Sequence, residues 1–233
     1  MKTTTEWRTE FDLLYNNLLS NQAPSLNDYE VSVLLTQAQE EMVITLYSGR
    51  RLQPFESTEE VKEYLSPLVK QVVLEPASNI AETAKINLDS YFFQLPEDLL
   101  FKTFEKATIA NNTLLCKGSA EREVNVVPIT QDEYDRTVGN PFKRSNERRV
   151  LSLLSGNRTA ELISRYPVIN YTVRYIKKPR PIILSNLAGT GLSINGETAE
   201  RTCELHEGIH RSILSRAVEL GKSIWLNTSQ QTS

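Results

Sequence analysis

The sequence predicts an α+β fold, with helices at both ends of the chain and an antiparallel, β-rich part between them. Apolar residues recur every three or four positions in the first third and near the C-terminus, as on one face of a helix. In the centre, Ile169, Tyr171 and Val173 alternate with polar residues, as in a strand with one wet face. We therefore expect a helical part (1–75 plus 200–226), a β-rich part (76–199) and a polar tail (227–233).

The first helix is expected near the N-terminus, with an apolar stripe at Trp7, Phe11, Leu14, Tyr15 and Leu18. It should end within 21–24. A second helix begins after Pro24, where Asn27 and Glu30 form a capping box, and should continue to Gly49.

A third helix follows Ser57 and Glu60, which repeat the capping-box spacing. Pro67 must interrupt it, because proline removes a backbone donor and clashes with the preceding turn. Alternatively, Ser66 and Pro67 begin a separate short helix.

The centre contains the clearest hairpin signal of the chain. The pair Gly156 and Asn157 separates the candidate strands 149–155 and 158–165, and two-residue turns of this kind join antiparallel strands. Residues 124–129 indicate a further strand.

Two segments are harder to assign. Pro179 and Pro181 bracket a short extended piece at 182–184. Residues 99–109 fit a helix about as well as a strand, so periodicity leaves both open.

Two further helices complete the prediction. Thr130 and Glu133 can cap a short helix at 134–138, before Gly139 ends it. A long C-terminal helix is expected over about 203–225.

Composition bears on several classes of function. The net charge of −3, from 26 basic and 29 acidic side chains, gives no overall positive field for nucleic acid. Cys116 and Cys203 do not make a disulfide framework, so reduced thiols in a protein folded in the cytoplasm are expected. No apolar run approaches the ~20 residues of a membrane span, and the N-terminus does not resemble a signal sequence.

Both histidines lie within residues 206–210, which have the H-E-x-x-H spacing of zinc peptidases. On a helix, His206 and His210 would share one face and could bind Zn²⁺, while Glu207 polarised a bound water. Catalysis also needs a third protein ligand and a cleft. Cys203 is a candidate ligand upstream, but a thiolate would indicate a structural rather than a hydrolytic site.

The same segment has a simpler interpretation as a packing helix. Ile213, Ala217, Leu220 and Ile224 continue an apolar stripe at helical spacing, which predicts packing or helix–helix contact. We therefore expect no catalysis and no bound metal or cofactor. A zinc metallopeptidase that uses His206, Glu207 and His210 is the principal alternative.

Two basic clusters could contact phosphate or an acidic partner. They are Lys143, Arg144, Arg148 and Arg149 in a loop, and Arg174, Lys177, Lys178 and Arg180 where a strand ends. Without stacking aromatics, solvated loops are the simpler interpretation, and a nucleic-acid-binding module is the second alternative.

Specific sequence blocks are spread over about residues 6–221: 9–17, 23–24, 29–40, 128–130, 133–134, 140–143, 174–179, 181–184, 203–205 and 216–220. In these blocks the chain resembles a virion structural protein of crAss-like tailed phages. The resemblance implies a ring protein of the head-to-tail connector, or neck, assembled beneath the portal from about twelve copies. It does not imply a histidine at position 206, so H-E-x-x-H becomes incidental.

The resemblance also implies likeness to the adaptors of short-tailed phages, whose helical bundles dock on the portal and whose β parts extend the channel. The expected partners are further copies of the chain, the portal protein and other neck or tail proteins, without a membrane. The chain would be made in the host bacterial cytoplasm and located in the virion at the head–tail junction. Mild negative charge suits a lumen through which phage DNA passes without specific binding.

Symmetric rings use heterologous contacts, in which one face of a subunit meets a different face of its neighbour. The candidate interface residues are Phe142, Lys143, Arg144, Ile213, Ala217, Leu220 and Ile224.

Overall fold

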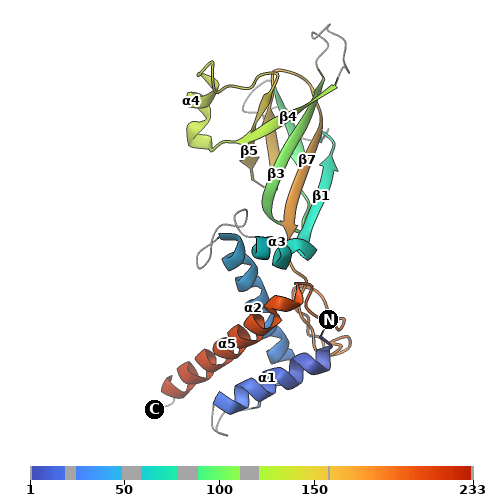
Figure 1. Cartoon of the computed structure of the whole chain (residues 1–233), viewed down its shortest axis with the longest axis vertical. Coiled ribbons are helices and arrows are strands. Elements are labelled where there is room, and N and C mark those ends of the chain that lie inside the picture. Colours follow the sequence, from blue (N-terminus) through green and yellow to red (C-terminus); the bar gives the residue numbers. More distant parts are fainter. Residues whose placement is uncertain are drawn as a thin grey trace. The chain divides into compact units, whose positions relative to one another are not determined.

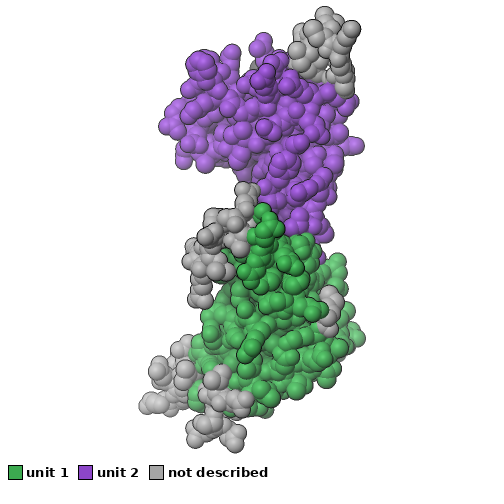
Figure 2. All heavy atoms as spheres, in the orientation of Figure 1, with its two compact units in different colours: residues 1–68, 178–233 green, residues 69–177 purple. Residues whose placement is uncertain are grey.

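The computed structural model describes residues 2–18, 25–48, 59–77, 89–110, 121–156 and 158–231 and confirms an α+β fold (Figure 1). The chain forms two compact units (Figure 2), which we call unit 1 (1–68 and 178–233) and unit 2 (69–177). Unit 1 contains the long helices and unit 2 contains the sheet. The division expected from the sequence, into 1–75 plus 200–226, 76–199 and 227–233, stays a prediction.

Unit 1 is built around three long helices. They are α1 (Thr4–Leu18), α2 (Asp28–Ser48) and α5 (His210–Gln231). α5 contacts both α1 and α2. The fully buried side chains of Trp7, Phe11, Leu35, Ile213 and Ala217 show that the predicted apolar stripes face one shared core.

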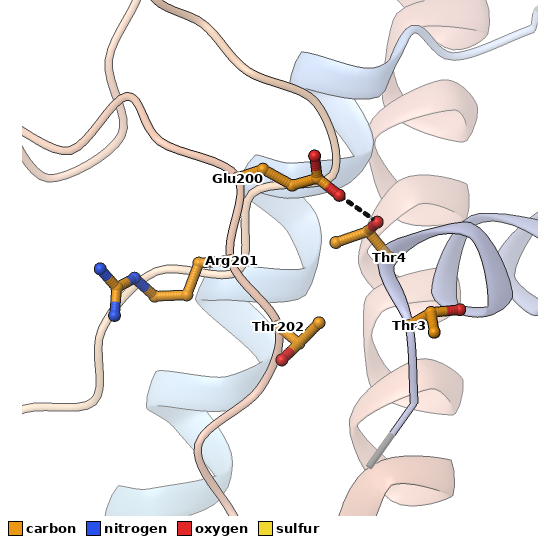
Figure 3. A pocket seen from close by; sticks show the side chains of 5 residues that line it. All are labelled: Thr3, Thr4, Glu200, Arg201 and Thr202. Carbon is orange, nitrogen blue, oxygen red and sulfur yellow. Dashed lines mark hydrogen bonds between the residues drawn. The ribbon is translucent and has the colours of Figure 1, made fainter.

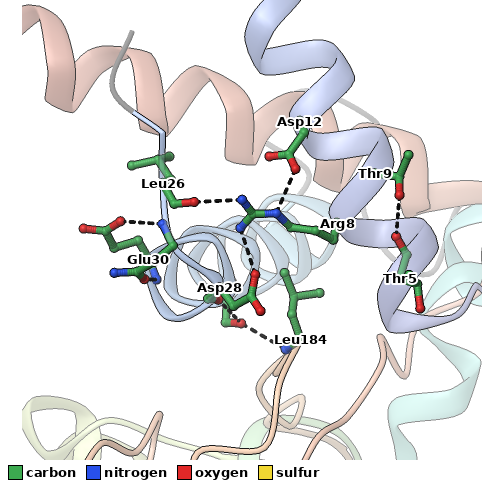
Figure 4. A network of polar contacts seen from close by, with 10 residues as sticks. Thr5, Arg8, Thr9, Asp12, Leu26, Asp28, Glu30 and Leu184 are labelled. Atoms are coloured by element: carbon green, nitrogen blue, oxygen red, sulfur yellow. Dashed lines mark hydrogen bonds and ion pairs between the residues drawn. The ribbon is translucent and has the colours of Figure 1, made fainter.

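The start of α2 has the predicted capping box. The Asn27 side chain accepts a hydrogen bond from the Glu30 backbone at 2.8 Å, and the Glu30 carboxylate accepts one from the Asn27 backbone at 2.8 Å. Arg8 of α1 reaches the same region: it donates to Asp12 and to the carbonyl of Leu26, both at 2.8 Å, and pairs with Asp28 (Figure 4). This network ties α1 to the beginning of α2.

The third helix ends before Pro67, as the sequence predicted. α3 (Glu59–Leu65) is followed directly by the 3₁₀ turn η1 (Ser66–Leu68), which contains Pro67. The alternative of a separate short helix at Ser66 is therefore confirmed.

The expected extended piece at 182–184 lies against α2 rather than in the sheet. The Ser32 hydroxyl accepts a hydrogen bond from the Leu184 amide at 3.0 Å, and the Thr36 hydroxyl accepts one from the Ile182 amide at 3.1 Å. Two residues of extended chain advance about 6.6 Å and one helical turn advances about 5.4 Å, so side chains one turn apart can meet every second amide. These hydroxyls stand where a neighbouring strand would otherwise supply acceptors.

Gln39 extends this polar ladder by one more turn. Its amide donates to the carbonyl of Arg180 at 2.8 Å, and its side-chain oxygen accepts from the thiol of Cys203 at 3.1 Å. Cys203 is buried and free, whereas Cys116 lies outside the described residues. A single bridge between Ile183 and Arg201 completes the pairing of this segment.

Unit 2 holds one seven-stranded sheet with the order β1-β7-β3-β4-β5-β6-β2. The strands are β1 (Val69–Leu74), β2 (Ser90–Gln94), β3 (Leu99–Ala110), β4 (Glu121–Pro128), β5 (Arg149–Ser155), β6 (Thr159–Ile163) and β7 (Val168–Lys177). β4 and β5 run parallel and the other pairs run antiparallel. The sheet is therefore mixed, and the expected antiparallel sheet is wrong for this one pair. The segment between β4 and β5 brings the chain back to the end of the sheet at which β4 begins, so that β5 runs in the same direction as β4.

That segment contains the 3₁₀ turn η3 (Gln131–Glu133) and the predicted short helix, α4 (Tyr134–Val138). The expected capping box is wrong, because Thr130 makes no side-chain capping hydrogen bond and the carboxylate of Glu133 accepts from Arg136 instead. Tyr134 and Val138 pack on a small apolar cluster of Leu151, Leu153 and Ile163 and so cover part of the sheet.

The two ends of the sheet approach each other. The amide of Ala77, just after β1, donates to the carbonyl of Phe92 in β2 at 2.7 Å. The Phe93 ring of β2 also packs against Tyr171 of β7, with ring centroids 5.3 Å apart. The sheet therefore curls around its core, which reduces the open strand edge.

The ambiguous segment at 99–109 is the long strand β3. Its pairing with β7 shifts register at three places, between Leu99 and Phe101, Lys102 and Phe104, and Thr108 and Ile109. Each shift moves subsequent side chains to the other face, which explains why the sequence shows no clean alternation there. The antiparallel pairing of β5 with β6 confirms the predicted hairpin. The expected two-residue turn is wrong, because Ser155 pairs with Thr159 and three residues, 156–158, lie between them. Arg158 takes a positive φ of 56° in this loop.

Candidate functional site

The H-E-x-x-H segment does not lie on one helix. His206 has an extended backbone (φ −58°, ψ 145°), and its Nδ1 accepts a hydrogen bond from the Gly208 amide at 3.2 Å, which caps the 3₁₀ turn η4 (Glu207–Ile209). α5 begins only at His210. The predicted helix start near 203 is therefore wrong, because the ring of His206 ends the irregular segment by capping it.

The two histidines contact different groups. His210 is buried, its ring N–H donates to the carbonyl of Leu205 at 3.0 Å, and its ring lies 5.0 Å from that of Trp7. Burial lowers the pKa of His210 below its ordinary value, so the neutral form is favoured. His206 instead lies near Glu63, at 3.7 Å, and Tyr64.

This arrangement lacks the premise of the zinc alternative, which requires both histidines on one helical face. Within the described ranges, no group of three or more His, Cys, Asp or Glu side chains is placed to hold a metal ion. Gly208 between the histidines fits closely, because an added Cβ would lie 2.8 Å from the Tyr64 ring. The segment therefore acts as a tightly packed helix start.

Unit 1 also has an open depression on its surface. It is lined by Thr3, Thr4, Glu200, Arg201 and Thr202 (Figure 3). The Thr4 hydroxyl donates to the Glu200 carboxylate, while Figure 3 shows the Arg201 side chain directed away from both threonines. Arg201 pairs with Glu197 at 3.1 Å. Both charged residues of the depression are therefore engaged in contacts within unit 1.

Several residues of the basic clusters have structural contacts. The guanidinium of Arg149 donates to the carbonyl of Phe142 and, at 3.4 Å, to that of Arg144. Arg174 donates to Gln71 at 3.1 Å, and Lys178 pairs with Glu40 at 3.3 Å. Arg174 and Lys178 of the second cluster therefore each have a local partner within their own unit.

The C-terminal stripe divides into a buried and an open half. Ile213 and Ala217 are 0% exposed within the chain, so they have no surface to offer another subunit. Leu220 is half-buried and Ile224 is 58% exposed. The open half lies toward the end of α5.

Phe142 is the most exposed large apolar side chain among the described residues, at 88%. It lies in the loop between α4 and β5, beside the exposed Lys143 and Arg144. Sequence reasoning identified this loop from its charge and its proline, but the exposure of the ring required the structure.

Other exposed apolar side chains escaped sequence reasoning: Leu13, Val33, Ile44, Val73, Phe104, Leu154 and Leu192. Phe104 could not be assigned to a face because β3 is bulged. Leu13 and Ile44 lie just outside the apolar stripes of their helices, and that helical position was the only available signal.

No helix in the described part of the chain has the length and hydropathy of a membrane span.

Comparisons with known proteins give a single consistent result. The model of the family described as phage tail ring protein 3/4 matches residues 1–232. Ring protein 3 of Bacteroides phage crAss001 is 41% identical over 221 residues, which cover 94% of each chain. Ring protein 4/5 of the same phage is 36% identical over 231 residues, covering 94% of this chain and 92% of the relative.

Proposed function

Because this chain belongs to the phage tail ring protein 3/4 family of crAss-like phages, we propose that it forms one ring of the head-to-tail connector, below the portal. The family match over residues 1–232 carries this proposal. The ring would comprise about twelve copies, provide a passage for phage DNA and offer a docking site for tail components.

The surface of the chain supports contacts between unlike faces. The open half of the α5 stripe, Leu220 and Ile224, belongs to unit 1, whereas Phe142, Lys143 and Arg144 belong to unit 2. A head-to-tail ring needs two different patches on each subunit, and neither patch needs to be complementary to itself.

The charge of the chain supports passage rather than retention of DNA. A net charge of −3 gives little general attraction for the phosphate backbone. Arg174 and Lys178 of the second basic cluster each have a local partner, which reduces the positive charge that they offer to phosphate.

Mass measurement of the purified chain, alone and mixed with the portal protein, tests the proposal. We expect a particle whose mass is a large multiple of 26.5 kDa, formed either alone or on the portal. A chain that stays monomeric and does not bind the portal would refute it.

The zinc peptidase alternative makes a separate forecast. It requires about one tightly held zinc per chain and hydrolysis that is lost in Glu207→Gln. We expect neither, because His210 is buried against Trp7 and His206 lies outside the helix.

A further inference from the structure

The loop that carries Phe142 is held in one conformation although its tip is exposed. The Asn140 side chain accepts a hydrogen bond from the Phe142 amide at 2.9 Å. The carbonyl of Asn140 accepts from the amides of Lys143 and Arg144 at 3.0 and 2.9 Å. Isolated exposed apolar residues are ordinary on protein surfaces, but one on a loop with this many internal hydrogen bonds is presented in a fixed position.

The base of the loop is attached to the sheet. Arg149 is the first residue of β5, and its guanidinium donates to the carbonyls of Phe142 and Arg144. Arg149 and Asn146 exchange two backbone hydrogen bonds of 2.8 and 3.2 Å. At the other end, α4 packs on the cluster around Leu151. The ring of Phe142 is thus supported by ordered structure, so the loop loses little conformational entropy when a partner binds.

The chemistry at the tip is that of a protein-binding anchor. Aromatic residues and arginine are enriched at the centres of interfaces, where a few of them supply most of the binding free energy. We propose that Phe142 is an anchor that inserts into the adjacent copy of this chain in the ring, on unit 1, whose sequence is net acidic and which exposes apolar side chains. This inference rests on the proposed function, since it names the contact that closes the ring.

The net charge of unit 1 is opposite in sign to that of the Phe142 tip. Acidic residues outnumber basic ones in the sequence of unit 1, whereas the Phe142 tip carries Lys143, Arg144 and Arg148. Unit 1 also exposes Leu13 and Ile44, which are 59% and 45% exposed. Opposite charge around an apolar contact fixes the orientation of two subunits as they meet.

DNA is the less favoured occupant of the tip. Proteins that bind single strands stack successive bases on several aromatic rings, and Phe142 is the one aromatic residue of segment 139–149. The guanidinium of Arg149, at the start of β5, donates to backbone carbonyls of the loop.

The test compares Phe142→Ala with Phe104→Ala, a matched truncation at an exposed phenylalanine of the same unit. Assembly is measured by mass against protein concentration under the conditions in which the unchanged chain forms rings. We expect Phe142→Ala to weaken assembly by at least about thirtyfold and Phe104→Ala to leave it close to unchanged. Asn140→Ala, which keeps the ring but frees the loop, should weaken assembly by a smaller factor.

Photo-crosslinking identifies the acceptor directly. With Phe142 replaced by p-benzoylphenylalanine, we expect a crosslinked dimer whose second attachment lies in unit 1 of the other copy. A crosslink within unit 2, or to another virion protein alone, would overturn the inference.

Failure of the inference and failure of the proposed function give different results. If the unchanged chain forms no ring and does not bind the portal, both fail together. If rings form equally well with Phe142→Ala, only the anchor is overturned. If Phe142→Ala and Arg148→Ala leave assembly intact but reduce salt-dependent retention of DNA, the tip contacts nucleic acid instead.

Discussion

Replacing Thr36 with valine should destabilise unit 1, because this change removes one acceptor from the polar ladder while keeping the shape of the side chain. The Thr36 hydroxyl accepts from the Ile182 amide at 3.1 Å and donates to the carbonyl of Ser32 at 2.8 Å. Thr36 is buried. In Thr36→Val the amide of Ile182 therefore loses its acceptor in a place that water does not readily reach.

The expected loss follows from the cost of an unsatisfied buried donor, about 1–3 kcal/mol. Thr45→Val is the matched control, because Thr45 lies on the same helix and donates to the carbonyl of Glu41 at 2.8 Å in the same i−4 geometry. No amide donates to Thr45 in the hydrogen bonds found among the described residues. The control should change stability by less than about 0.5 kcal/mol.

Urea unfolding followed by tryptophan fluorescence measures this difference. Both tryptophans, Trp7 and Trp225, belong to unit 1, so the signal reports that unit alone. With a slope of about 2 kcal/mol per molar urea, Thr36→Val should lower the midpoint by about 0.5–1.5 M. Equal midpoints for Thr36→Val and Thr45→Val would refute the idea that α2 side chains replace a neighbouring strand.

Three further predictions concern other buried groups. Burial lowers the pKa of His210 below its ordinary value of 6.5, so as pH falls the unfolded chain takes up the proton before the folded chain does, and the free energy of unfolding should decline below about pH 6.5. In His210→Gln, the urea midpoint should decline less over the same pH range. Parallel pH profiles of the two chains would contradict this. Gly221→Val should destabilise unit 1 by about 1–3 kcal/mol in thermal unfolding, since a Cβ added at Gly221 would lie only 3.3 Å from the side chains of Leu34 and Tyr15, and valine adds two further methyl groups. An unchanged melting temperature would count against that packing. Burial raises the pKa of the Cys203 thiol to about 12, so with Cys116 replaced by Ser the native chain should resist thiol reagents at neutral pH until it is unfolded; rapid labelling of the folded chain would show that the thiol is accessible.

Local sequence rules predicted the elements whose signals are local. The capping box of Asn27 and Glu30 marked the start of α2, and the Gly156-Asn157 pair marked the hairpin between β5 and β6, although not the length of its loop. Both depend on residues close together in the chain, and so both were visible before any tertiary structure.

Elements that depend on distant partners were not predictable in the same way. The parallel pairing of β4 with β5 follows from the path of the chain through α4, which no local pattern encodes. The predicted start of α5 was wrong. The sequence favoured a regular helix from 203, whereas His206 caps the 3₁₀ turn η4 and α5 begins at His210.

The candidate interface shows the same division. Sequence periodicity assigned Ile213, Ala217, Leu220 and Ile224 to one apolar face, but periodicity cannot distinguish a face covered by α1 and α2 from one left for another subunit. Ile213 and Ala217 are buried within the chain and Ile224 is open. The contact role of Leu220, Ile224 and Phe142 stays a proposal.

Reconstruction of the intact phage particle around its tail axis tests the central claim most directly. The account predicts density for this chain as a closed ring of repeated copies between the portal and the tail, with Phe142 of each copy covered by the next. Density for the chain in another part of the virion, or as isolated single copies, would contradict it.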